Sequence, residues 1–180
     1  MNRKYTTLDL IYMAIGAALI VACSWITIPF IVPFTLQTFA VFTVVSLLGG
    51  RKGFLSILVY ILLGAVGLPV FSGFKGGVGV LVGTTGGYII GFLFIALIYQ
   101  ICEKIASDKL IFRIVFMVLG LLVCYAFGTA WFMFVYTRNT GAVELGTALG
   151  WCVLPFIIPD LIKLALALFV ASRLAPVIKK

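Results

Sequence analysis

The chain has 180 residues, of which 64% are hydrophobic and only 10% are charged, and its net charge is +8. A soluble domain is about 45–50% apolar and about 25% charged, so this composition excludes a water-soluble fold. The thirteen basic residues are dispersed between apolar runs, which argues against a nucleic-acid partner and indicates that the lipid bilayer is the solvent.

Six apolar runs follow one another along the chain, and prolines, glycines or charged residues separate them. Each run is a candidate membrane helix, because a span needs roughly 20 mainly apolar residues. We therefore predict an all-α integral membrane protein with a single transmembrane domain over residues 1–180. Its six helices are expected at about 8–28, 34–48, 54–69, 80–101, 114–136 and 151–171.

The basic residues alternate between the loops that these six helices would leave on the two sides of the membrane. Ten of them fall on the side that holds both termini: Arg3, Lys4, Arg51, Lys52, Lys104, Lys109, Arg113, Arg173, Lys179 and Lys180. Lys75 and Arg138 fall on the opposite side, and Lys163 lies within the last span. Because loops rich in Lys and Arg stay in the cytosol, this split predicts that both termini are cytosolic.

Two ionisable residues, Asp160 and Lys163, lie inside the last apolar run. A spacing of three residues puts them on one face of a helix. A charge at this depth costs at least about 2.5–3.5 kcal/mol, so a compensating role is expected. The pair is either a structural ion pair that holds two helices in register or part of a polar binding site. Pro159 favours a binding site, because a proline breaks the helix and frees a carbonyl.

The outer part of the fourth run carries the sequence GTTGGY at residues 83–88. Hydroxyl and backbone N–H groups of Thr85, Gly86, Gly87 and Tyr88, at the start of a helix, would suit a ligand carboxylate or carbonyl. The alternative is close helix packing, since glycines recur here every four residues.

The first outer loop contains Pro29 and Pro33, which stiffen it, followed by Phe34, Thr35 and Gln37. An amide such as Gln37 is rare in a membrane helix, and it either bonds a neighbouring helix or binds the polar edge of a ligand. This loop, the GTTGGY segment and the start of the last span all fall on the outer side. We therefore expect a pocket that opens outward.

Several functions are disfavoured by missing motifs. The sequence has no GxxxxGK[ST] phosphate loop, no dinucleotide fingerprint, no histidine and no CxxC pair. One acid and one base inside the membrane do not make a catalytic constellation. We expect no catalytic residue, no metal and no cofactor.

The first span carries Ala14, Ala18 and Ala22 at four-residue spacing. Such a smooth stripe lets another helix approach closely. That helix could belong to this bundle or to a partner protein.

Four motifs resemble the BioY family, the biotin-binding S components of energy-coupling factor (ECF) vitamin transporters. They are VPFTLQT at 32–38, GLPVF at 67–71, GTTGGYIIG at 83–91 and PDLIK at 159–163, in the family's order and at similar spacing. The resemblance covers nearly the whole chain. It departs from the family at Thr84, where a proline is common, and this affects the expected rigidity of the loop.

The resemblance implies an S-component-like bundle in a prokaryotic cell membrane that captures biotin from outside. It implies partners too, a membrane coupling (T) protein and two cytosolic ATPases that supply energy. Asp160 and Lys163 would contact the polar groups of biotin, the Thr85–Tyr88 segment and the first loop would line or cap the pocket, and Ala14 and Ala18 would dock on the coupling protein. The alternatives are an S component for another vitamin and a stand-alone secondary carrier.

Overall fold

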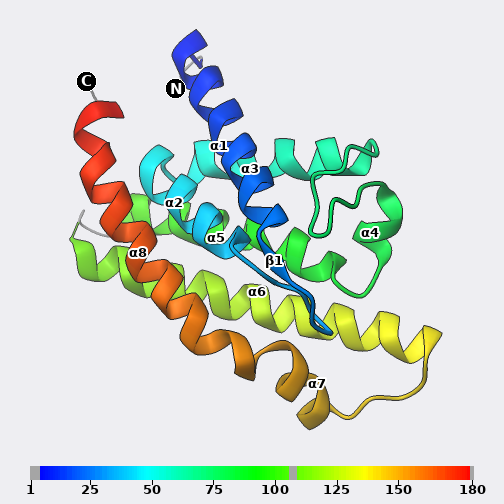
Figure 1. The fold of residues 1–180 in the computed structure, drawn as a ribbon. Coiled ribbons are helices and arrows are strands. Elements are labelled where there is room, and N and C mark those ends of the chain that lie inside the picture. Colours follow the sequence, from blue (N-terminus) through cyan, green and yellow to red (C-terminus); the bar gives the residue numbers. More distant parts are fainter. Residues whose placement is uncertain (1–4, 106–108, 179–180) are drawn as a thin grey trace.

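The computed structural model describes residues 5–105 and 109–178, and this part of the chain is mostly helical (Figure 1). Helices predominate because long apolar segments in lipid must satisfy their backbone hydrogen bonds internally. In chain order the elements are α1 (Thr7–Trp25), β1 (Thr27–Ile28), β2 (Phe34–Thr35), α2 (Gln37–Leu48), α3 (Gly50–Ala65), α4 (Val78–Val82), α5 (Gly86–Ile105), α6 (Leu110–Asn139), α7 (Leu145–Cys152) and α8 (Leu154–Ile178).

Four segments of the described chain are long and apolar enough to cross a membrane. They are α1, α5, α6 and the stretch Leu145–Pro176, which contains α7 and most of α8. The 12-residue helix α2 is only about 18 Å long and α3 has 16 residues, so both are shorter than a full span of about 20 residues. The fold is that of a multi-pass membrane protein, and the count of six spans stays a prediction.

The first outer loop departs from the all-α prediction. It forms a short antiparallel hairpin in which Thr27 pairs with Thr35 and Ile28 pairs with Phe34. Prolines 29 and 33 lie between the two strands, and a residue before a proline is pushed towards extended backbone. Helix α2 consequently starts at Gln37, not at residue 34.

Two other predicted spans are interrupted. The run 80–101 is divided by residues 83–85 into the short α4 and the long α5. The last run is interrupted at Val153, just before Pro155 in the first turn of α8, a position where a proline is tolerated. Helix α8 continues through Pro159, so the prediction that this proline breaks the helix is wrong.

Glycines bring α5 and α6 close together. A Cβ atom on Gly87 would lie 2.3 Å from the Cβ of Trp131, and one on Gly91 would lie 2.7 Å from the Cys124 sulfur. The predicted packing role of these two glycines is therefore confirmed. Gly79 and Gly83, which share the same spacing, lie outside α5.

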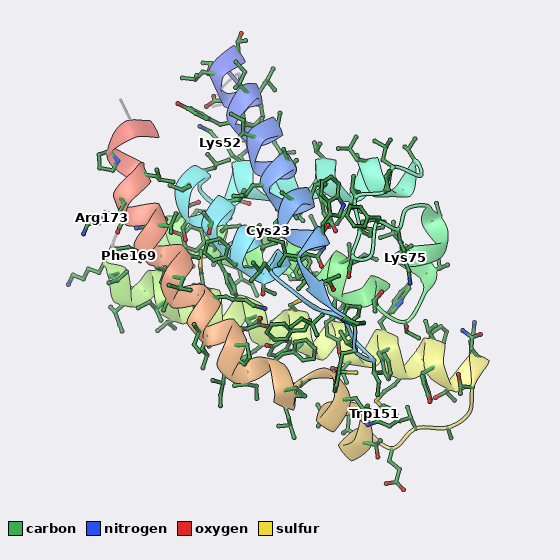
Figure 2. The ribbon with its side chains drawn as sticks, in the orientation of Figure 1. Cys23, Lys52, Lys75, Trp151, Phe169 and Arg173 are labelled. Atoms are coloured by element: carbon green, nitrogen blue, oxygen red, sulfur yellow. The ribbon has the colours of Figure 1, made fainter. Side chains whose placement is uncertain are left out.

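The loops fall into two groups at opposite ends of the bundle. In Figure 1 the first turns of α1, the last turns of α8, the α2–α3 junction and the start of α6 lie towards the top and left, and the hairpin tip, α4 and α7 lie towards the right and bottom. Figure 2 places Lys52 and Arg173 in the first group and Lys75 in the second. Arg3, Lys4, Lys179 and Lys180, which the charge count also used, lie outside the described residues.

Candidate functional site

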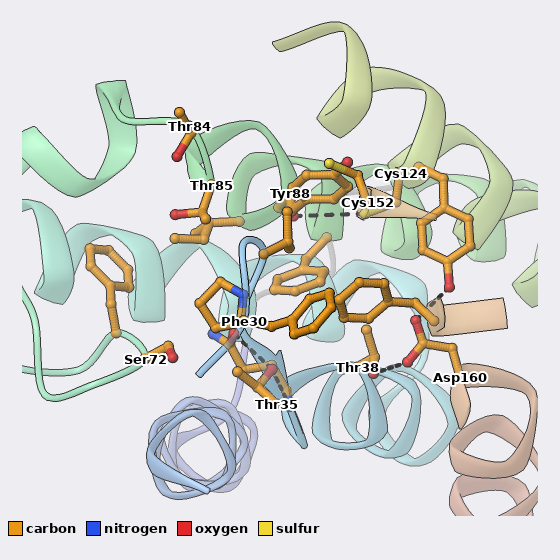
Figure 3. A pocket seen from close by; sticks show the side chains of 18 of the residues that line it. Phe30, Thr35, Thr38, Ser72, Thr84, Thr85, Tyr88, Cys124, Cys152 and Asp160 are labelled. Carbon is orange, nitrogen blue, oxygen red and sulfur yellow. Dashed lines mark hydrogen bonds between the residues drawn. The ribbon is translucent and has the colours of Figure 1, made fainter. Parts of the chain in front are cut away.

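A cavity of about 280 Å³ lies between the hairpin, the start of α2, the loop before α4, and helices α5, α6 and α8 (Figure 3). Its volume is near the lower end of the about 300–1,000 Å³ typical of small-molecule sites. Much of its wall is apolar and aromatic, and includes Phe71, Ile89, Phe92, Leu121 and Phe156. The cavity can therefore enclose a ligand with a substantial apolar body.

The buried carboxylate of Asp160 is at one end of this cavity. Its exposed fraction is 2%, and three side chains donate hydrogen bonds to it. Thr38 from α2 donates to Oδ1 at 2.8 Å, Tyr125 from α6 donates to Oδ2 at 2.6 Å, and the Lys163 ammonium donates to Oδ1 at 2.9 Å. Helices α2, α6 and α8 thus meet at one ionised group.

Lys163 lies one turn further along α8 and is 6% exposed. Besides Asp160, its Nζ donates to the Thr35 carbonyl at 2.7 Å and to the Thr38 hydroxyl at 3.2 Å. The same Nζ lies 4.2 Å from the centre of the Phe34 ring, a favourable cation–π distance. An ammonium has three hydrogens, and all three find acceptors here.

This arrangement explains how a lipid-embedded helix tolerates the pair. Removing two charges from water costs several kcal/mol per ion, and a pair offsets this only when its remaining donors and acceptors are satisfied. The opposite charges cancel, and every donor of Lys163 is used. Asp160 Oδ2 accepts only from Tyr125 among the described residues, so this oxygen retains capacity for one more donor. A ligand N–H group is a suitable donor.

Gln37 is held at the first turn of α2 by a separate set of contacts. Its side-chain amide donates to the Tyr60 hydroxyl of α3, and its carbonyl oxygen accepts from the Thr35 hydroxyl at 3.1 Å. Both of the roles considered for Gln37 are therefore compatible with its position, since it bonds a neighbouring helix and also lines the cavity.

Most of the predicted binding residues meet at the cavity. Those that line it are Thr35, Gln37, Thr85, Tyr88, Asp160 and Lys163. Phe34 is not among the lining residues, but it lies against Lys163 and stacks on the lining residue Phe156, with ring centres 5.7 Å apart.

Gly86 and Gly87 are not brought to the cavity lining. A Cβ on Gly86 would lie 1.7 Å from the Leu81 carbonyl oxygen, and Gly87 packs against Trp131. The presence of glycine at these two positions is explained by close packing at the start of α5, where any side chain would collide with backbone or with α6.

Sequence reasoning missed two residues that complete the ionised network, Thr38 and Tyr125. Thr38 belongs to a motif that we singled out, but only residues 34, 35 and 37 of that motif were expected to bind. Tyr125 lies in the middle of an apolar run, where its hydroxyl marks a polar group that needs a partner but does not indicate which one. The described residues contain no group of three or more His, Cys, Asp or Glu side chains that could hold a metal.

The alanine stripe lies on another face of the molecule. Ala14, Ala18 and Ala22 are exposed on α1 and, with Val59 and Leu63 of α3, they line a shallow apolar groove. No described helix of this chain covers these alanines, so the stripe is available to another helix.

Comparisons with known proteins show which family the chain resembles. The BioY family model matches residues 1–180. The biotin transporter BioY of Thermotoga maritima is 42% identical over 167 residues, which cover 92% of this chain and 95% of the relative. A probable biotin transporter BioY of Pyrococcus horikoshii is 43% identical over 143 residues, which cover 79% of this chain and 80% of the relative.

A solved structure is similar over nearly its whole length. The crystal structure at 2.1 Å of the S-component for biotin from an ECF-type ABC transporter matches with a TM-score of 0.81 and 27% sequence identity, covering 95% of this chain and 94% of that chain. A match of the family model to the full chain, together with relatives above 40% identity, shows that the chain belongs to the BioY family.

Proposed function

We propose that this chain is the biotin-binding S component of an ECF-type ABC transporter and takes part in biotin uptake. The relatives carry the name of biotin transporters, and the similar structure is an S-component for biotin, so the chain is a transport protein and not an enzyme. The single observation that carries the proposal is the partly satisfied Asp160 carboxylate at the end of an apolar cavity.

The chemistry of biotin matches this cavity. Biotin has an apolar bicycle and chain, a ureido group with two N–H donors and one carbonyl, and a carboxylate. In our proposal a ureido N–H donates to Asp160 Oδ2, and Tyr88, Phe92 and Phe156 cover the apolar body. Burial of the bicycle against these rings supplies most of the affinity, and the hydrogen bond to a charged acceptor supplies selectivity.

Transport requires energy, and we propose that it comes from partners. These are a membrane coupling (T) protein and two cytosolic ATPases, as expected for an ECF-type transporter. The exposed Ala14–Ala18 stripe on α1 supports docking of the coupling protein, because small residues permit close helix approach in lipid.

We further propose that the chain lies in the prokaryotic cell membrane with six spans and both termini in the cytosol. The pocket would then open to the outside. Lys52 and Arg173 support this orientation, because they lie towards one end of the bundle in the described chain.

The test is ligand binding by the purified protein in detergent. Radiolabelled biotin should bind with a stoichiometry of 1:1, and excess thiamine or riboflavin should not displace it. Saturable binding of a different vitamin, with none of biotin, would assign the chain to another substrate. Uptake by cells that lack the coupling protein and the ATPases would favour a stand-alone carrier.

A further inference from the structure

The connection between α3 and α5 exposes apolar side chains at the end of the bundle that holds the hairpin tip and α7 (Figure 1). Five large apolar residues of this connection are exposed: Val66, Leu68, Phe74, Val78 and Val82. Val66 is 84% exposed, and α4 has no buried residue at all. Lys75 is the one charged residue between positions 66 and 85. Contiguous apolar exposure of this kind marks a surface that an apolar partner covers.

The other long connection at this end, between α6 and α7, is polar. Arg138 lies in the last turn of α6, and the exposed residues that follow include Asn139, Thr140 and Glu144. Two connections at the same end of the molecule therefore expose opposite kinds of side chain. A difference in their depth relative to the membrane accounts for the contrast.

The lengths of α3 and α6 set those depths. The two helices start at a similar level, because Arg113 near the start of α6 donates to the carbonyl of Ser46, just before α3, at 3.2 Å. At 1.5 Å per residue the 30 residues of α6 extend about 45 Å, and the 16 residues of α3 extend about 24 Å. The hydrocarbon is about 30 Å thick, so α6 passes through it and α3 ends about 6 Å short. The connection after α3 is thus left at the edge of the hydrocarbon.

The backbone of this connection is suited to that depth, because irregular backbone near lipid must form its hydrogen bonds within the protein. Eight of its N–H groups donate to backbone carbonyls: those of Val66, Gly67, Leu68, Val70, Phe71, Gly77, Val80 and Gly83. The Trp25 indole N–H covers a further acceptor, the Pro69 carbonyl, at 2.9 Å. The segment therefore exposes apolar side chains while many of its backbone polar groups are satisfied internally.

The exposed apolar surface is continuous with that of the membrane helices. Leu62 is exposed in the last turn of α3, and Val66 follows four residues later in helical backbone, so both lie on one face. Phe74 stacks on Trp25 with ring centres 5.1 Å apart. Tryptophan is enriched at the boundary between hydrocarbon and headgroups, where its ring is buried and its N–H is bonded.

We infer that residues 66–82 are immersed in the leaflet at this end of the bundle, with Val66, Leu68 and Phe74 against lipid acyl chains. The partner of this surface is the bilayer itself and not a second protein. The same segment contributes Phe71 and Val80 to the lining of the cavity, so lipid contact holds one wall of the cavity in place. This anchoring requires neither the proposed ligand nor the coupling protein.

The test is spin labelling of single introduced cysteines in the full chain, reconstituted alone into phosphatidylcholine vesicles. Val66→Cys and Leu68→Cys report on the segment. Both positions are exposed, and the four native cysteines are buried, so the label reaches the introduced thiol without disturbing the core. Glu144→Cys is the matched aqueous control from the other connection, and Leu122→Cys, exposed near the middle of α6, is the lipid control.

Power saturation compares the accessibility of each label to oxygen, which concentrates in hydrocarbon, and to a nickel complex, which stays in water. The ratio of oxygen to nickel accessibility at Val66→Cys and Leu68→Cys should exceed that at Glu144→Cys several-fold and approach that at Leu122→Cys. A ratio equal to that at Glu144→Cys would show an aqueous loop and overturn the inference. Exclusion of both relaxants would show that a second copy of the chain covers the surface, and would overturn it too.

Discussion

Asp160 and Lys163 form an ion pair in a region where hydrocarbon penalises charge. Each residue should therefore stabilise the fold only while the other is present, and single and double substitutions can measure this. Replacing Asp160 by Asn leaves the Lys163 ammonium buried without a counter-ion. Breaking a buried pair in this way costs about 3–5 kcal/mol. Replacing both residues, as Asp160→Asn with Lys163→Met, removes the uncompensated charge, so most of the lost stability should return.

Measuring biotin affinity as well as stability separates a role of the Asp160–Lys163 pair in ligand binding from a role in holding the helices together. We expect Asp160→Asn to lower the thermal unfolding temperature in detergent and to weaken biotin binding. The double variant should regain the unfolding temperature but not the affinity. Asp9→Asn is the control, because Asp9 forms the other described carboxylate–lysine pair, with Lys52, away from the cavity. A double variant with wild-type affinity would show that the pair only holds the helices together.

The limits of sequence reasoning are clearest at this site. Asp160 and Lys163 were predicted to be site residues because a charge in an apolar run is costly. Their three-residue spacing is a local property of one helix and can be read from the sequence. Thr38 and Tyr125 are 122 and 35 residues from Asp160 in the chain. Hydroxyls are common in membrane helices, and nothing in the local sequence specifies which of them reaches the carboxylate. Tertiary packing of α2 and α6 against α8 decides it.

At the scale of elements, helix α1 has two different small-residue faces. Gly16 and Ala17 are buried, and a Cβ on Gly16 would lie 2.9 Å from the Ser56 hydroxyl oxygen of α3. Ala14 and Ala18 are exposed. The buried face holds the bundle together, and the exposed face is free to receive a partner helix.

This division predicts the effect of bulky substitutions. Ala14→Trp together with Ala18→Trp should abolish co-purification with the coupling protein while leaving biotin affinity within about twofold of the wild type, because neither residue lines the cavity. Ile15→Trp is the control, since Ile15 is also exposed on α1 but lies outside the groove. If the double variant lost biotin binding, the stripe would be part of the internal packing instead.

Element boundaries were predicted well where hydropathy alone decides them and poorly where backbone conformation does. The starts and ends of α5 and α6 fall near the predicted runs, apart from the break at residues 83–85. The hairpin was missed because its residues are as apolar as a span, and hydropathy does not separate extended from helical backbone. Short strands in a proline-flanked loop leave little periodic signal to detect.

At the scale of the whole molecule, α2 shows why the number of spans cannot be read from helix length. It has 12 residues, and eight of them are buried inside the bundle. A helix shielded by protein need not match the thickness of the hydrocarbon, because its ends contact other polar groups of the protein rather than lipid. The predicted count of six therefore depends on the sidedness of the loops, which is open to experiment.

Thiol labelling measures that sidedness with little background, because all four native cysteines are buried. Glu144 and Lys104 are both exposed, and the six-span arrangement assigns them to opposite sides of the membrane. In intact cells, a membrane-impermeant maleimide should label Glu144→Cys but not Lys104→Cys. Both should react after permeabilisation, which controls for exposure of the thiol.

Labelling of Lys104→Cys alone in intact cells would invert the bundle, and labelling of both would place the two loops on the same side. Either result would show that the orientation inferred from the ten-to-two distribution of basic residues is wrong. The predicted pattern carries a functional consequence as well. Glu144 directly precedes α7, whose Cys152 lines the cavity, so external labelling there would put this wall of the cavity towards the side from which biotin arrives.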